Sequence, residues 1–68
     1  MNKVELEVVM KRYGDTQESL AEAIGISRGS LNSKINETKN AVFNQPEMAA
    51  IRRRYQLNPE DFDRIFFT

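Results

Sequence analysis

The stretch that decides the fold runs from residue 17 to residue 36 and reads QESLAEAIGISRGSLNSKIN. Apolar residues recur at helical spacing on both sides of Gly25, a residue that readily adopts a positive φ. These apolar positions are Leu20, Ala21, Ile24, Ile26 and Leu31. The pattern predicts one helix over residues 17–24, a three-residue turn, and a second helix from residue 28 to about residue 36.

A tight pairing of two helices restricts particular positions, and this stretch meets those restrictions in register. Ala21 is small, as required where the second helix packs across the first. Thr16 and Ser27 stand where N-caps are needed, one before each helix. Ile26 is expected to be a buried plug between the helices. The residues therefore predict a helix-turn-helix over residues 17–36.

Three further helices and one loop are predicted around this pair. The first helix spans residues 4–13, and residues 36–43 predict a loop because they are polar and lack a helical period until its end. The last two helices begin after Asn44 and after Asn58, which are good N-caps. The inner faces of these three helices are expected to be Leu6, Val9, Met10 and Tyr13; Met48, Ile51 and Tyr55; and Phe62, Ile65 and Phe66.

The composition limits the class of protein. The 68 residues are 40% hydrophobic and 29% charged, which suits one small globular domain over residues 1–68. The chain has no Cys and no His, which excludes disulfides, thiolate nucleophiles, imidazole bases and the usual zinc ligands. No apolar run reaches the roughly 20 residues of a membrane helix, so a cytoplasmic location is expected. The sequence predicts an all-α domain, a compact bundle of about five short helices, without enzymatic activity, metal or cofactor.

Charge is distributed unevenly along the chain. Ten Lys and Arg balance ten Asp and Glu, and this zero sum argues against a nucleic-acid partner, because phosphate binding depends on surplus cations. By segment, however, residues 1–26 and residues 55–68 each carry −2, whereas residues 27–54 carry +4. The basic segment contains the second helix of the pair. Such asymmetry orients a molecule on a duplex even where the average field is weak.

Several spaced positions resemble the helix-turn-helix of phage Cro and repressor proteins. The residues that carry this resemblance are Thr16, Gln17, Leu20, Ala21, Gly25, Ile26, Ser27 and Leu31. The remainder of the chain is similar to the small Cro-like regulators of Gram-positive phages, through Asn36, Val42-Phe43, Gln45-Pro46-Glu47 and Ile65-Phe66-Phe67. Lys34 departs from the wider superfamily, which has an apolar residue there, and Ile35 takes the core role one position later. That departure leaves the pitch and the end of the helix open.

The resemblance implies a lambda-repressor-like domain whose second motif helix reads base edges in the major groove. With Leu31 and Ile35 inward, the helical step turns the other faces outward. The residues expected to read bases are Ser27, Arg28, Gly29, Asn32 and Ser33. Arg28 is the best candidate, because a bidentate Arg on guanine is the commonest specific contact. Asn32 is expected to pair with adenine, and Gly29 to allow a close approach.

A second set of residues is expected to hold the DNA backbone. Its members are Gln17, Lys34, Asn36, Lys39 and Asn40. Gln17 stands at the start of a helix, where backbone N–H groups also favour phosphate. For the row Arg52–Arg54, which spans three helix faces, a solvated surface or an acidic partner is a better explanation than DNA contact.

The resemblance also implies that the protein acts on operator DNA as a homodimer that covers a promoter. A dimer contact is expected at the end of the chain, among Ile65, Phe66 and Phe67. Phe66 and Phe67 point about 100° apart on a helix, so one monomer is not expected to bury both. The chain end looks natural, which favours a small Cro-like protein, although a fragment of a larger repressor is the other interpretation.

Other classes of function stay open at this stage. A protein-interaction module, such as an antirepressor or an adaptor, would use the same helical scaffold without salt-dependent DNA affinity. An antitoxin that represses its own operon is a neighbour within the DNA-binding class. A small enzyme is the weakest alternative, because no nucleophile, base and oxyanion donor converge in the sequence. No membrane partner and no small-molecule ligand are indicated.

Overall fold

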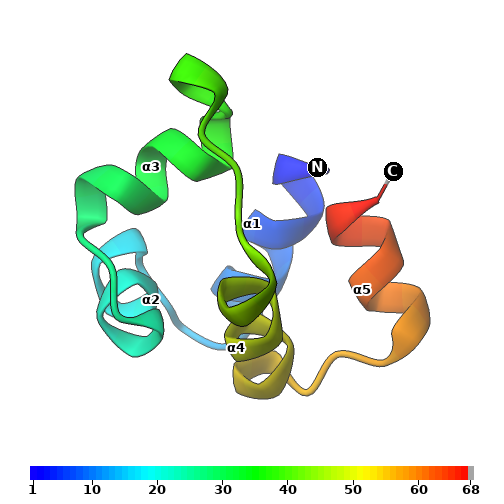
Figure 1. Cartoon of the computed structure of the whole chain (residues 1–68). Helices are drawn as coiled ribbons and strands as arrows, with labels where there is room; N and C mark the ends of the chain where they lie inside the picture. Colours follow the sequence, from blue (N-terminus) through cyan, green and yellow to red (C-terminus); the bar gives the residue numbers. More distant parts are fainter. Residues whose placement is uncertain (68) are drawn as a thin grey trace.

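The chain forms five α-helices and one 3-10 turn in the part that the computed structural model describes, residues 1–67. The elements are α1 (Lys3–Arg12), α2 (Gln17–Ile24), α3 (Arg28–Asn36), η1 (Thr38–Asn40), α4 (Gln45–Tyr55) and α5 (Pro59–Phe66). Figure 1 shows α2 and α3 on one side of the molecule, with α4 between that pair and α5. The predicted all-α bundle of five helices is confirmed. None of these helices is long and apolar enough to cross a membrane.

Every α-helix begins at a residue whose side-chain oxygen accepts a backbone N–H from its own first turn. These N-caps are Asn2, Thr16, Ser27, Asn44 and Asn58. Thr16 and Asn44 form full capping boxes, in which the side-chain oxygens of Ser19 and Glu47 accept the backbone N–H of the cap residue. Since an N-cap contributes about 1 kcal/mol, five caps matter to a chain with so little core.

The core takes one fully buried aliphatic side chain from each helix. These side chains are Leu6, Leu20, Leu31, Ile51 and Ile65. The aromatic rings of Phe43, Tyr55 and Phe66 complete the core at its edges. The first and last helices are also joined through the backbone, because the N–H of Asn2 donates to the carbonyl of Ile65 at 2.6 Å. Consequently the start of α1 and the end of α5 lie side by side (Figure 1).

The turn between α2 and α3 follows the predicted chemistry. Gly25 ends α2 with a left-handed φ of 81°, and its N–H bonds back to the helix. The N–H of Ile26 donates to the carbonyl of Ala21 at 3.0 Å, which closes the turn over the small residue. Figure 1 shows the two helix axes pointing in clearly different directions.

Three local expectations are corrected. Tyr13 is not on the buried stripe of α1, because it caps the helix and is 48% exposed, while its hydroxyl donates to the carbonyl of Tyr55. Ile26 is only partly buried and packs against the edge of the core. The segment after α3 is not a plain loop, since η1 turns within it on three residues of positive φ, at Glu37, Lys39 and Asn40.

Candidate nucleic-acid interface

The third helix has one buried line of residues and a broad polar surface. Leu31 and Ile35 are its buried residues, as the sequence predicts. Ser33 is half-buried, and the residues exposed on the remaining faces include Arg28, Gly29, Asn32 and Asn36. Helix α3 therefore exposes most of the side chains expected to read bases.

The amino-terminal end of α3 is exposed. The side chain of Arg28 has no hydrogen bond or ion pair with any other residue of 1–67. A Cβ added to Gly29 would meet nothing within 4 Å, so this side of the helix is accessible to a large partner. The hydroxyl of Ser27 accepts the N–H of Ser30 at 3.1 Å, which holds Ser27 in place as the cap. An unpaired guanidinium thus stands at a fixed helix end beside open space.

The carboxyl-terminal end of α3 is held by an amide network. The side-chain NH₂ of Asn36 donates to the carbonyl and to the side-chain oxygen of Asn32, at 3.0 and 3.1 Å. Lys3 of α1 donates from its ammonium to Asn36 Oδ1 at 2.9 Å. Lys3 thus adds a cation to the polar surface of α3. The sequence did not predict this role, because the contact joins residues 33 positions apart and no local pattern marks it.

Lys34 does not stand where a phosphate clamp is expected, and this expectation is corrected. Its ammonium pairs with the carboxylate of Glu47 on α4, and the two side chains are only 19% and 9% exposed. Burial alone would raise the pKa of Glu47, but the hydrogen bonds from Lys34 and from the backbone of Asn44 outweigh it and lower that pKa. The pair explains how a charged residue occupies a usually apolar position, and α3 stays regular to Asn36.

The segment after α3 presents the two remaining clamp candidates. Lys39 and Asn40 are exposed in η1, and neither side chain has a hydrogen bond or ion pair with another residue of 1–67. Their φ angles of 55° and 61° place both in the left-handed region. Asn tolerates that region well, whereas Lys is less common there. The segment that follows α3 extends beyond the end of that helix, at the outside of the bundle (Figure 1).

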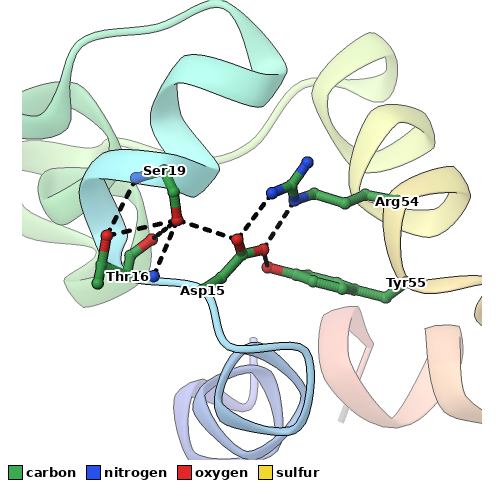
Figure 2. Close-up of polar contacts among 5 residues, drawn as sticks. All are labelled: Asp15, Thr16, Ser19, Arg54 and Tyr55. Atoms are coloured by element: carbon green, nitrogen blue, oxygen red, sulfur yellow. Dashed lines mark hydrogen bonds and ion pairs between the residues drawn. The ribbon is translucent and has the colours of Figure 1, made fainter.

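The amino end of α2 is tied to α4 by a polar network centred on Asp15 (Figure 2). The carboxylate of Asp15 accepts hydrogen bonds from Arg54, Tyr55 and Ser19. The hydrogen bonds from Arg54 do most to hold the pKa of Asp15 well below its usual range, against the opposing effect of burial. Burial and the hydrogen bond to Asp15 raise the pKa of Tyr55 above its usual range. Gln17, the predicted phosphate contact, directly follows this anchored cap.

Of the three residues expected at a dimer contact, Phe67 alone is exposed. Ile65 and Phe66 are buried inside the monomer, where Phe66 packs edge-on against Phe43. They are therefore part of the core and not of an outer surface, which corrects the expectation for both. Phe67 is 65% exposed and lies between two shallow hollows lined in part by Met48.

The remaining basic residues of α4 are mostly engaged elsewhere. Arg54 pairs with Asp15, which confirms an acidic partner for that residue. The guanidinium of Arg52 lies over the ring of Phe62, 5.4 Å from its centroid. Among the described residues, the exposed cations on α3, on η1 and in contact with α3 are Arg28, Lys39 and Lys3.

No family model matches this chain, and neither does any curated protein or solved structure.

Proposed function

We propose that this chain is a sequence-specific double-stranded DNA-binding domain of the helix-turn-helix type, and that it acts as a Cro-like transcriptional repressor. The observation that carries the proposal is the surface of α3. An unpaired Arg28, an unobstructed Gly29 and an exposed Asn32 lie together on a helix that is fixed by a capped, glycine-closed turn.

The mechanism assigns base reading to α3. Its amino-terminal half enters the major groove, where Arg28 donates two hydrogen bonds to guanine and Asn32 pairs with adenine. The side-chain oxygen of Asn32 already accepts from Asn36, so this amide is oriented before the DNA arrives. Ser27 and Ser33 contact base edges or nearby phosphates, and Gly29 allows the helix to approach closely.

The DNA backbone is held on both sides of α3. Gln17 grips one phosphate at the amino end of α2, and the turn with Lys39 and Asn40 grips another. The ammonium of Lys3, which is held by Asn36, supplies a further phosphate contact in place of Lys34, since Lys34 is committed to Glu47. Two copies related by a two-fold axis then read half-sites about 34 Å apart and exclude polymerase from the promoter.

The charge of this surface predicts how binding depends on salt. Two cations per monomer, Lys3 and Lys39, are assigned to phosphates, which corresponds to a slope of about −2 in log K against log salt, or about −4 for a dimer. Fluorescence anisotropy against duplexes from the neighbouring intergenic DNA, repeated at several salt concentrations, measures that slope. The absence of any salt-dependent affinity for DNA would instead support the protein-interaction module.

Arg28→Ala and Lys39→Ala separate base reading from backbone binding. We expect Arg28→Ala to remove the preference at one base pair, at about 1–3 kcal/mol, with other positions unaffected. Lys39→Ala should weaken all sequences alike and make the salt slope shallower by about 1. Anisotropy with a panel of single-base operator variants measures both effects. Indistinguishable profiles for the two variants would contradict this division of roles.

A further inference from the structure

The Asp15 carboxylate, two residues before α2, accepts four hydrogen bonds. It accepts from Nε and Nη2 of Arg54, both at 2.7 Å, from the hydroxyl of Tyr55 at 2.6 Å and from the hydroxyl of Ser19 at 2.9 Å. Its side chain is only 7% exposed. Figure 2 shows the donors arriving from two sides, α4 on one and the first turn of α2 on the other.

These bonds continue directly into the cap of α2. The N–H of Thr16 donates to Ser19 Oγ at 2.9 Å, and the N–H of Ser19 donates back to Thr16 Oγ1 at 3.1 Å. The same Ser19 hydroxyl donates to the carboxylate of Asp15, so it links the capping box to that carboxylate. A continuous polar chain therefore leads from the end of α4 to the start of α2.

The first turn of α2 lacks apolar anchoring. Leu20 and Ala21 are buried and Ile24 packs against the core, so the apolar anchor of this eight-residue helix lies in its middle and its last turn. Residues 17–19 are polar and place no buried apolar side chain at the amino end. The Asp15 network holds that end at a second point, one turn away from the apolar anchor.

We propose that Asp15 is a positioning residue for DNA binding. By fixing the first turn of α2 against Arg54 and Tyr55 of α4, it places Gln17 and the neighbouring backbone N–H groups where they meet a phosphate. This inference rests on the proposed function. Hydrogen bonds weaken steeply with misplacement, so a small pivot of the helix loses the contact.

Asp15→Asn tests the proposal by the sign of its effect. The substitution adds one positive charge near the DNA surface, because it removes the carboxylate and frees Arg54. Electrostatics alone would then strengthen binding to DNA. If Asp15 acts by positioning, the DNA affinity instead falls about 10-fold, which corresponds to one charge-assisted hydrogen bond to phosphate. Anisotropy at a temperature where both proteins are fully folded measures the change.

Two further variants serve as controls. Ile65→Val lowers stability from the core of α5 without touching the network, and we expect its DNA affinity to equal that of the wild type. Tyr55→Phe keeps the ring and removes one donor to Asp15, so it should weaken binding in the same direction but less. If Asp15→Asn fails to fold, Tyr55→Phe alone decides the matter: unchanged affinity would overturn the proposal.

Hydrogen exchange in the absence of DNA tests the anchoring independently. The N–H groups of Ser19 and Leu20 are bonded to Thr16 and should exchange faster in Asp15→Asn than in Ile65→Val. Equal exchange would overturn the anchoring. If the wild type binds no duplex at any salt, the proposed function and the DNA part of the inference both fall. A wild type that binds normally, with an equally tight Asp15→Asn, overturns the inference alone.

Discussion

Lys34 shows how a single ion pair adapts a charged residue to an inward position. It lies three residues after Leu31 and directly before Ile35, so it sits beside the buried face of α3. Its stem covers the core edge, and its ammonium reaches Glu47 at the first turn of α4. A residue selected only for DNA contact would instead project outward, as Arg28 does.

Lys34→Met should destabilise the protein by about 1–3 kcal/mol, because it leaves the carboxylate of Glu47 partly buried without its partner. Urea unfolding followed by circular dichroism measures the loss. Adding Glu47→Gln should restore much of the stability, because Gln still serves as the third residue of the capping box. A double variant no more stable than Lys34→Met would show that the pair is not the cause.

The turn between α2 and α3 depends on the positive φ of Gly25. Gly25→Ala should cost about 1–2 kcal/mol, because a Cβ is disfavoured at a φ of 81° even though no atom lies within 4 Å of it. The midpoint of urea unfolding reports this loss. A stability unchanged from the wild type would mean that the turn adapts at no cost.

Gly29 offers the matched substitution on the other side of that turn. It lies inside α3 without a positive φ and in open space, so Gly29→Ala should stabilise the free protein by about 0.5–1 kcal/mol. The same methyl group should weaken DNA binding, since it prevents the closest approach to the groove. Urea unfolding and anisotropy on one protein sample measure both effects. Gain of stability with unchanged affinity would remove Gly29 from the interface.

At the scale of the whole molecule, the Asp15 network joins α2 to α4 and makes stability depend on pH. The pKa of Asp15 is lowered in the folded state, so the unfolded chain takes up the proton first. The advantage of the wild type over Asp15→Asn, roughly 1–3 kcal/mol, should therefore be constant above about pH 5. Below about pH 4 it should shrink as the pH falls. Urea unfolding at several pH values measures it, and an advantage that grows toward acid would contradict the network.

The two adjacent phenylalanines at the end of the chain make a matched pair for assembly. Phe66→Ala should cost about 3–5 kcal/mol and unfold much of the population, because this ring is part of the core. Phe67→Ala should leave the monomer stable and reduce self-association, since that ring is exposed. Sedimentation equilibrium with and without DNA measures the mass. An identical mass for wild type and Phe67→Ala in both conditions would remove Phe67 as a dimer contact.

Local sequence specifies the helices and turns of this protein. Four of the five N-caps, the glycine of the tight turn and the apolar spacing act within a few residues, so their effect can be predicted from local sequence. The fifth cap, Asn2, was not predicted. The same reasoning placed Leu31 and Ile35 inward and Arg28 outward, because a helical step alone fixes those directions. It also anticipated that Phe66 and Phe67 would not both be buried, since they leave the helix at different angles.

The tertiary structure decided which charges are available. Lys34 and Arg54 count as cations in the sequence, yet each meets a carboxylate on another element, 13 and 39 residues away. Lys3 reaches the end of α3 across 33 residues. Such pairings depend on how helices pack, and no local pattern encodes them. Folding thus leaves the zero net charge unchanged while it selects the few cations that a partner can reach.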